Sequence, residues 1–425
     1  MLFFIITFLS TFFAIYHLIN STKFKSESEK YKIFQKGFSI LIPCYNEAGI
    51  IKNTINGLDL IDYNNYEIIF INDGSTDDTM DILNEALQLI EIEDGFFQSN
   101  FKENIFVIDK ANGGKADSLN AGIKKSNKEL VCTLDADCIL HQDALYYMNN
   151  VFQDNDVIAS GGVVKVLQMF RLNKKSKLLV KLQTLEFLKG FYVYKASLAF
   201  NNALAIISGA FGVFRREELE IIGGFNSGLG EDIDVTLRMQ DYAIKNNKKV
   251  TYDLNAICYT ECPESFKDLT KQRIRWQKAF VDAIIKNRKF LFKSVLSKGL
   301  SFHIIIDSLI SAGLSTTLLV VNAVFSIFLG IGHMSRALIY YYVITIVFHV
   351  IYSFYAVLRE RKSYEKSIKK NVLGVILVDI LFFRFINALY YIFGSILYFF
   401  NSNDWNKVER TNHNYNVLIK EVGEA

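Results

Sequence analysis

Two acidic residues in the first third of the chain have the types and spacing of a metal site. Asp135 and Asp137 stand two residues apart, directly after the apolar run Leu130–Leu134. Carboxylates this close repel each other, and a bound divalent cation removes that repulsion. Hard carboxylate oxygens suit Mg²⁺ or Mn²⁺, and either ion can also hold phosphate groups. The pair indicates a metal site, with an exposed acidic turn as the alternative.

A second acidic pair follows a glycine-rich stretch. Glu231 and Asp232 come after Gly223–Gly230 and begin a predicted helix. Acidic residues are favoured at a helix N-terminus whatever their function, so a structural role is the simpler explanation. The functional interpretation is a general base that takes a proton from an acceptor hydroxyl.

A basic and aromatic cluster, Gln272-Arg273-Ile274-Arg275-Trp276, lies about forty residues further on. Gln272, Arg275 and Trp276 stand at positions i, i+3 and i+4, which share one face of a helix. A guanidinium beside an indole suits a pyrophosphate next to a sugar ring, because apolar sugar faces stack on aromatic rings. The alternative is that Trp276 anchors the chain at a membrane interface while Arg275 reaches water.

Three polar turns follow strand-like runs in the first part of the chain: Pro43–Glu47, Asn72–Asp78 and Asn112–Lys115. After parallel strands, acid- or amide-bearing turns flank one crevice, where they can bind ribose hydroxyls or base N–H groups. Glycines let the backbone approach a ligand, and Lys115 adds a point charge for phosphate. The spacing is neither that of a P-loop nor that of a dinucleotide fingerprint. Ordinary turns and helix caps remain the alternative.

The elements that must position these residues alternate between strand and helix. Short β-branched runs separate helix-like stretches, which predicts βαβ units and a mostly parallel sheet. The strand-like runs are Phe38–Pro43, Tyr66–Ile71, Asn104–Ile108 and Glu129–Leu134, and the helix-like stretches are Glu47–Leu58, Thr79–Ile90 and Lys115–Lys124. Such sheets bind ligands beyond the carboxyl ends of their strands. We therefore expect the motifs to gather at one rim.

Long apolar runs flank this α/β region and predict membrane spans, which need ~20 apolar residues. The runs are Leu2–Ile19, Ile304–Ile331, Ala337–Leu358 and Val372–Phe400. The basic loop Arg359–Lys370 is expected to face the cytosol, which places the amino terminus outside and the central domain inside. Asp379 and Arg384 interrupt the last run, so part of it could lie in the interface or re-enter.

The predicted organisation has four parts. An N-terminal transmembrane helix (residues 1–21) precedes a cytosolic domain (22–300), C-terminal transmembrane helices (301–400) and a tail (401–425). Ser265–Lys298 is predicted to be an amphipathic helix on the inner leaflet, with a surface helix of the soluble domain as the alternative. A net charge of +3 is too weak to indicate a nucleic-acid partner. The five cysteines form no metal-binding pattern and suggest free thiols in a reducing compartment.

Together and in this order, the motifs resemble those of the processive family-two glycosyltransferases. That family includes the synthases of cellulose, hyaluronan, chitin and bacterial poly-N-acetylglucosamine. The resemblance covers Phe38–Phe280, and its most specific marks are Asp135-Ala136-Asp137, Glu231-Asp232 and Gln272-x-x-Arg275-Trp276. It implies an α/β domain with the GT-A (Rossmann-like) fold, cytosolic and flanked by transmembrane helices of the plasma membrane.

The resemblance implies a donor site for a nucleotide-diphosphate sugar. Tyr45, Glu47 and Asp73 would hold uridine, Lys115 the diphosphate region, and Arg275 the pyrophosphate. Asn72 departs from the family pattern, because an acid often precedes the aspartate that corresponds to Asp73. This departure weakens the uridine assignment slightly.

The same resemblance implies a metal, a base and an acceptor site. Asp137 would bind Mg²⁺ or Mn²⁺, with Asp135 beside it on the nucleotide side, and Asp232 would be the catalytic base. Gly209, Gln272 and Trp276 would line the site of the acceptor sugar. Gly230 stands where cellulose synthases have threonine, and the short chain lacks the regulatory C-terminal domain of bacterial cellulose synthases.

The expected function is therefore processive, inverting polymerisation of a UDP-sugar, with UDP-N-acetylglucosamine preferred. The growing polysaccharide is the acceptor, and the membrane helices would pass it outward. The expected partners are the donor, the polymer, the lipid bilayer and, if the resemblance extends so far, a small membrane accessory subunit. One alternative is non-processive transfer of a sugar to a lipid carrier. A more distant one is a non-catalytic receptor or transporter.

Overall fold

The computed structural model describes residues 2–26, 34–170, 177–293, 295, 299–318, 320–321, 336–360 and 366–400. The chain separates into two compact units. The first comprises Met1–Phe24, Ser176–Ala203 and Pro263–Glu409, and the second comprises Lys25–Lys175, Leu204–Cys262 and Arg410–Ala425. The predicted tail (401–425) and part of the predicted span Ile304–Ile331 lie outside the described residues. The linear division predicted at residues 21, 300 and 400 stays a prediction.

The second unit is built on one mixed ten-stranded sheet in the order β3-β4-β5-β2-β1-β6-β9-β8-β10-β7. Its strands are β1 (Phe38–Cys44), β2 (Tyr66–Asp73), β3 (Leu89–Glu93), β4 (Phe96–Ser99), β5 (Ile105–Lys110), β6 (Leu130–Leu134), β7 (Cys138–Leu140), β8 (Val157–Val166), β9 (Phe211–Arg215) and β10 (Lys249–Thr260). Its helices are α2 (Ile51–Leu58), α3 (Thr79–Leu87), α4 (Lys115–Lys125), α5 (Ala144–Phe152), the short 3₁₀ helix η1 (Leu167–Phe170), α8 (Arg216–Ile221) and α9 (Glu231–Lys245).

Four neighbouring strands, β5, β2, β1 and β6, are parallel. Every residue of β6 is buried, and all of β1 except Pro43. Apolar runs of this kind are typical of parallel strands that are covered on both faces. The predicted alternation of strands and helices is confirmed here.

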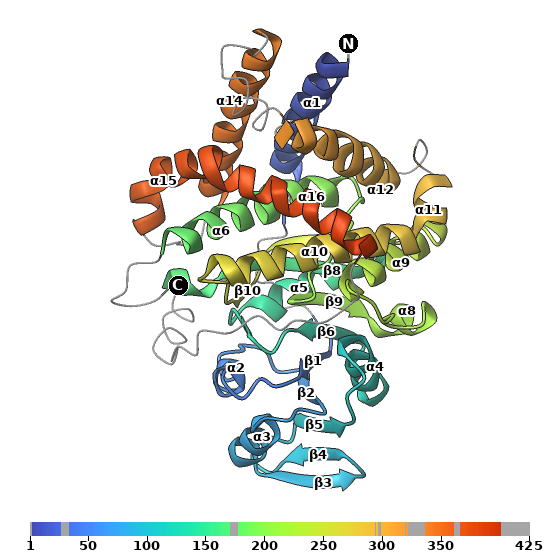
Figure 1. Ribbon diagram of the computed structural model, residues 1–425. Helices are drawn as coiled ribbons and strands as arrows, with labels where there is room; N and C mark the ends of the chain where they lie inside the picture. Colours follow the sequence, from blue (N-terminus) through green and yellow to red (C-terminus); the bar gives the residue numbers. More distant parts are fainter. Residues whose placement is uncertain are drawn as a thin grey trace. The chain divides into compact units, whose positions relative to one another are not determined.

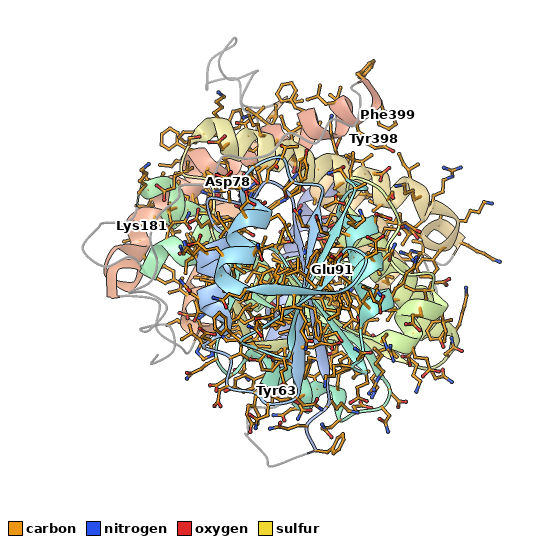
Figure 2. All side chains as sticks on the ribbon, turned by 90° about the horizontal axis from the view of Figure 1, so that it is seen from below. Tyr63, Asp78, Glu91, Lys181, Tyr398 and Phe399 are labelled. Carbon is orange, nitrogen blue, oxygen red and sulfur yellow. The ribbon has the colours of Figure 1, made fainter. Side chains whose placement is uncertain are left out.

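Outside these four strands the sheet departs from the mostly parallel one that we predicted. The β3–β4 hairpin continues it antiparallel to β5, and β9 is antiparallel to both β6 and β8. Figure 1 shows the hairpin beyond β5 at the end of the sheet, and Figure 2 looks onto it and labels Glu91 on β3. The helix predicted over Thr79–Ile90 ends at Leu87, and the alternating run Ile90-Glu91-Ile92-Glu93, followed by Asp94-Gly95, belongs to this hairpin.

The register of the parallel strands places their polar ends side by side. Cys44 at the end of β1 pairs with Asn72 of β2, and Asn72 pairs with Asp109 of β5. The turns that follow β1, β2 and β5 therefore leave the sheet at one edge. Asp135 follows β6 at the same edge, because β6 is parallel to β1.

The first unit is helical. It contains α1 (Leu2–Lys23), α6 (Leu178–Leu188), the π-helix η2 (Lys189–Lys195), α7 (Ala196–Phe200), α10 (Phe266–Lys286), α11 (Arg288–Lys293), α12 (Gly299–Phe302), the π-helix η3 (His303–Ala312), α14 (Arg336–Arg359), α15 (Lys366–Val378), the π-helix η5 (Asp379–Phe383) and α16 (Arg384–Phe400). Within this unit α1 packs on α7, α15 on α6, and α10 along α16.

The amphipathic helix predicted over Ser265–Lys298 is two helices, α10 and α11, and residues 294 and 296–298 lie outside the described residues. α10 begins where the side chain of Ser265 accepts a hydrogen bond from the Asp268 N–H. Its polar side chains reach α16: Gln277 bonds Ser395 at 3.0 Å, and Tyr398 donates to Asp282 at 3.0 Å. Its predicted place on the inner leaflet stays a prediction.

By length and composition, two described helical segments could cross a membrane, Gly299–Leu318 and Val372–Phe400. The apolar helical segment Val343–Arg359 is shorter than these two. The spans predicted for Ala337–Leu358 and Leu2–Ile19 stay predictions.

Asp379, which interrupts the last apolar run, is paired with two side chains of the same unit. Asp379 is buried, and its carboxylate lies 2.5 Å from the Lys189 ammonium and 2.7 Å from Nε2 of His349. Asp379 begins the π-helix η5, and Lys189 begins the π-helix η2. Single π-turns often occur where a helix carries a functional or strained residue. The charge is thus held inside this unit by two partners.

Candidate active site

The turns after β1 and β2 are locked together by backbone-to-side-chain hydrogen bonds. Asn46 adopts a left-handed conformation with φ of 55°, and its side-chain oxygen accepts from the Thr76 N–H at 2.8 Å. The Glu47 N–H donates to Oγ1 of Thr79 at 2.8 Å. This pairing holds Tyr45 and Glu47 beside the turn of Asp73, and the Tyr45 side chain is exposed. The three predicted uridine-binding residues therefore come from one pair of joined turns.

Asp73 organises the turn that carries Lys115. Its carboxylate accepts from the backbone N–H groups of Gly113 at 2.9 Å and Gly114 at 2.8 Å, and from the Lys110 ammonium at 2.6 Å. Burial raises the pKa of Asp73, but these hydrogen bonds outweigh burial and lower it overall. Gly114 has φ of +86°, a conformation that L side chains rarely adopt, which explains a glycine directly before α4.

Lys115, the first residue of α4, connects three parts of the site. Its ammonium lies 2.7 Å from Oδ1 of Asp135, after β6, and 2.9 Å from Oε1 of Glu231, at the start of α9. Burial alone lowers the pKa of this lysine, but Asp135, Glu231 and Asp232 together raise it well above its usual value. Lys115 therefore stays charged. Since an ammonium has three donors, one remains for a ligand.

Asp232, the second residue of α9, lies near the Lys115 ammonium. Its Oδ2 accepts from the Gly209 N–H at 3.1 Å, and its Oδ1 accepts from the Ile233 N–H at 2.9 Å. A Cβ added at Gly209 would lie 2.9 Å from the Lys115 ammonium, so only glycine lets the backbone approach both groups. The structure thus brings Gly209, Lys115 and Asp232 together, as the sequence-based assignment requires.

The glycine-rich stretch before α9 is held by two side chains. Asn120 of α4 exchanges hydrogen bonds with the backbone of Phe225, both at 2.8 Å. Arg238 donates to the carbonyl oxygens of Ile222 at 2.8 Å and Gly224 at 2.6 Å, and to Asp234 at 2.8 Å. The start of α9, and with it Asp232, is therefore fixed from two helices.

The environment makes Asp232 an unusually basic carboxylate. Burial, followed by the charge of Glu231, raises its pKa from the ordinary 3.8 to about 6, although Lys115 and the two backbone N–H groups act in the opposite direction. A carboxylate with a pKa near 6 is ionised at neutral pH and accepts a proton more readily than a normal aspartate. This is the property that a general base needs.

The acidic pair after β6 has a donor set that fits a hard divalent cation. Ligand atoms of Asp135, Asp137 and Cys138 all lie within 4.8 Å of one another. Burial, followed by the neighbouring Cys258 and Asp137, raises the pKa of the Cys138 thiol well above its usual range. The neutral thiol is a poor ligand, which leaves the two carboxylates. Thr260 of β10 donates to Oδ2 of Asp137 at 3.2 Å and orients it.

The third motif lies in the first unit, on α10. Trp276 is exposed on one side, while the guanidinium of Arg273 lies 4.4 Å from its ring centre on another. Arg273 is buried and also binds Glu186 of α6 at 2.8 Å. Gln272 and Arg275 lie on the same helix, and Oε1 of Gln272 is buried with no hydrogen-bond partner among the described residues.

Sequence reasoning gave no role to two residues that support the motifs, Lys110 and Arg273, and did not foresee one contact of Glu231. Lys110 lies beside Asp73 only because β5 pairs with β2, and the register places these two residues opposite each other. Glu231 was named as a helix-start acid, but its contact with Lys115 depends on how α9 meets α4. Arg273 occupies a variable position of the Gln-x-x-Arg-Trp pattern, and its contact with the Trp276 ring was not predicted from the sequence.

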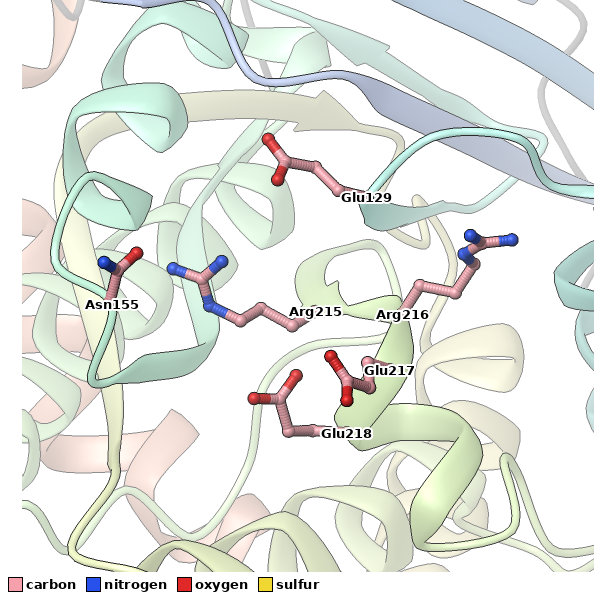
Figure 3. A pocket seen from close by; sticks show the side chains of 6 residues that line it. All are labelled: Glu129, Asn155, Arg215, Arg216, Glu217 and Glu218. Carbon is pink, nitrogen blue, oxygen red and sulfur yellow. The ribbon is translucent and has the colours of Figure 1, made fainter.

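A cavity of about 280 Å³ lies elsewhere in the second unit, lined by Glu129, Asn155, Arg215, Arg216, Glu217 and Glu218. Figure 3 shows the Arg215 guanidinium pointing toward Asn155 while Arg216 points the other way. Arg215 donates to the carbonyl oxygens of Val157 at 2.7 Å and Phe152 at 2.9 Å. Because Glu129 precedes β6 and Asp135 follows it, this cavity lies at the opposite edge of the sheet from the acidic cluster.

The chain matches a family model over residues 39–222, described as "Glycosyl transferase family 2". It is 33% identical over 275 residues to a poly-β-1,6-N-acetyl-D-glucosamine synthase of Staphylococcus epidermidis, covering 64% of this chain and 60% of the relative. The similarity thus spans less than two thirds of that relative. A synthase with the same description from Staphylococcus aureus (strain MSSA476) is 31% identical over 314 residues, covering 70% of this chain and 69% of the relative.

A solved structure shares the fold. A mannosyltransferase from Pyrobaculum calidifontis, in complex with GDP-Man and Mn²⁺, superposes with a TM-score of 0.56 and covers 93% of this chain and 99% of its own. The two sequences are 16% identical, so the likeness supports the predicted GT-A-like α/β fold and no more.

The raised pKa of Asp232 predicts that its charge destabilises the folded protein at neutral pH. Above pH 6 the carboxyl is ionised in both folded and unfolded chains, and folding buries that charge; below its ordinary value near 4 it is protonated in both. Asp232→Asn should therefore raise the unfolding midpoint by roughly 3 °C or more at neutral pH. The gain should shrink as the pH falls through 6. Differential scanning fluorimetry across pH measures both effects.

Asp234→Asn is the matched control, because Asp234 lies on the same turn but pairs with Arg238 at 2.8 Å and accepts from Asn226 at 3.0 Å. This variant should lower the midpoint. If Asp232→Asn lowered it as much as Asp234→Asn does, the attraction of Lys115 would outweigh burial, and the charge of Asp232 would be stabilising.

Proposed function

Because the chain belongs to glycosyl transferase family 2, we propose that it is a processive, inverting enzyme that polymerises N-acetylglucosamine from UDP-N-acetylglucosamine. The observation that carries the proposal is the cluster in which Lys115 joins Asp135 to Glu231 beside Asp232. It supports a site in which Lys115 would bind phosphate, the acid pair after β6 would bind a metal ion and Asp232 would act as the base. The similarity to poly-N-acetylglucosamine synthases supports the choice of sugar.

The donor would lie at the edge of the sheet where β1, β2 and β6 end. Tyr45, Glu47 and Asp73 are proposed to hold uridine. Oδ1 of Asp73 already accepts two hydrogen bonds and Oδ2 one, so Oδ2 keeps one acceptor site for a donor N–H or hydroxyl. The remaining donor of the Lys115 ammonium and the guanidinium of Arg275 are proposed to bind the diphosphate.

Asp137 and Asp135 would hold Mg²⁺ or Mn²⁺, in accord with their hard carboxylate oxygens and with the Mn²⁺ bound by the mannosyltransferase of the same fold. When bound there, the cation supplies positive charge against the leaving diphosphate. Three carboxylates, Asp135, Glu231 and Asp232, surround the Lys115 ammonium, and Asp137 lies beside Asp135. This excess of negative charge would attract a divalent cation.

The reaction would be a single displacement. Asp232 takes the proton from the terminal hydroxyl of the acceptor, and the resulting oxygen attacks the anomeric carbon from the face opposite the diphosphate. The bond from that carbon to the diphosphate oxygen breaks, and the configuration inverts. Lys115 and Arg275 stabilise the negative charge that develops on the leaving group. The N–H of Gly209 holds Oδ2 of Asp232, which orients the base.

The acceptor is proposed to stack on Trp276, with Gln272 and Gly209 completing its site. The Trp276 ring is exposed while Arg273 covers another part of it, so its orientation is fixed before a sugar arrives. The unpaired Oε1 of Gln272 can accept a sugar hydroxyl. A stacked terminal sugar needs only a shift of one unit after each addition, which is the basis of processivity.

The location follows from the same proposal. The apolar segments Gly299–Leu318 and Val372–Phe400 would lie in the plasma membrane, with the second unit in the cytosol, where UDP-sugars are made. The polymer would leave through the bilayer, alone or with a small accessory subunit.

Metal-dependent turnover is the first test. Purified protein in lipid should release UDP from UDP-N-acetylglucosamine only with Mg²⁺ or Mn²⁺, and Asp137→Ala should abolish release. Asp156→Ala is the control, because Asp156 is an exposed acid of the second unit whose carboxylate lies 3.2 Å from the Lys248 ammonium; it should keep full activity. Full turnover in excess chelator, or faster release from another UDP-sugar, would contradict the metal or the sugar assignment respectively.

Product length tests the acceptor site. Trp276→Ala should lose polymer while UDP release by slow donor hydrolysis persists, and Trp276→Phe should keep part of the polymer because stacking survives. Phe292→Ala, which removes another exposed aromatic side chain of the first unit, is the control and should leave the product unchanged. Labelled product is resolved on a gel. Equal polymer length and amount from all variants would show that Trp276 only anchors the helix.

A further inference from the structure

A second cluster of metal-ligating side chains lies in the first unit, outside the candidate active site. It consists of His17 of α1 with His303 and Asp307 of the π-helix η3. One ligand atom from each residue lies within 4.8 Å of the others, and the three residues are 3–7% exposed. Ionisable groups in an apolar helical unit are costly, so such a cluster calls for a physical reason.

Both imidazole rings direct one nitrogen at the same carboxylate oxygen. Nε2 of His17 lies 2.9 Å from Oδ2 of Asp307, and Nδ1 of His303 lies 3.9 Å from it. Three donor atoms from two helices thus converge on one point.

The other nitrogen of each ring faces a hydroxyl group. Nδ1 of His17 lies 2.8 Å from Oγ of Ser197, and Nε2 of His303 lies 3.3 Å from the hydroxyl of Tyr16. Metal-binding histidines usually donate their outer N–H to an oxygen, which fixes the tautomer and turns the inner lone pair toward the metal. Both histidines have this arrangement.

A proton alone does not account for the cluster. A proton shared between His17 and Asp307 would satisfy that pair, but Nδ1 of His303 is buried and lies 3.9 Å from Oδ2 of Asp307, too far for a good hydrogen bond. A cation between the three residues would satisfy all of them. Buried polar groups are nearly always satisfied, which favours the cation.

We propose that His17, His303 and Asp307 bind a divalent metal ion, Zn²⁺ by the chemistry of its ligands. Two imidazole nitrogens and one carboxylate oxygen form a donor set that zinc prefers, whereas the all-carboxylate pair Asp135 and Asp137 suits Mg²⁺ or Mn²⁺. The ion links α1 to η3 through His17 and Asp307, which are 290 residues apart in the chain. It cross-links these helices within the first unit, and its binding does not depend on the proposed polymerase activity.

Metal analysis of the full chain tests this proposal. The protein is purified in detergent without a histidine tag, in the Asp137→Ala background, loaded with Zn²⁺ and desalted. Mass spectrometry of the metal should find one zinc per chain, and His303→Gln or Asp307→Asn should lower it by tenfold or more. His349→Gln is the matched control, because His349 is a largely buried histidine of the same unit that pairs with Asp379 instead; it should keep its zinc.

A second measurement on the unmutated cluster guards against variants that do not fold. Chelator-stripped protein titrated with Co²⁺ should develop the visible absorption of cobalt bound to nitrogen and oxygen ligands, and Zn²⁺ should remove it. Zn²⁺ should also raise the unfolding midpoint. No zinc in the unmutated cluster, no cobalt absorption, or equal zinc in His303→Gln and its parent would overturn the proposal.

Discussion

A single buried ammonium, that of Lys115, holds the candidate active site together. It lies between Asp135, which follows β6, and Glu231, which begins α9, and it is itself the first residue of α4. A charge removed from water must be paired, because an unpaired one costs far more than the fold can supply. The positions of a strand end and two helix starts are therefore coupled through one cation. The Asp73 carboxylate accepts hydrogen bonds from the N–H groups of Gly113 and Gly114, which fixes the turn directly before Lys115.

The same interaction sets the chemistry of Asp232. Burial and the neighbouring Glu231 push its pKa up, while Lys115 pushes it down, and the balance leaves it near 6. Without Glu231 the pKa of Asp232 would be lower, and without Lys115 it would be higher. A buried carboxylate with a raised pKa makes the folded protein less stable at neutral pH than it could be. Such a sacrifice of stability is common at catalytic sites.

Much of the site was predictable because it follows local rules. Strand-like runs ending in polar turns predicted a shared rim, and β1, β2, β5 and β6 confirm the parallel strands that create it. The acid pairs were visible because they are adjacent in sequence. Their roles stay predictions, since contacts alone do not establish them.

What could not be predicted depends on residues that are far apart in the chain. Asp379 looked like an interruption of a span, but Lys189, 190 residues away, neutralises it. Arg273 looked like a spacer between motif residues, yet it packs on Trp276 and binds Glu186 on another helix. The antiparallel strand β9 likewise depends on long-range pairing with β6 and β8, which periodicity does not encode.

The pH dependence of kcat/KM, compared between the wild type and Lys115→Met, tests the central claim most directly. In the wild type the activity should fall about tenfold per pH unit below a pKa of about 6, because Asp232 must be ionised to accept a proton. In Lys115→Met the residual activity should fall off at a higher pH, because the charge that lowers the pKa of Asp232 is gone. An acid limb near pH 4 in the wild type, or one that does not move when Lys115 is replaced, would contradict the account.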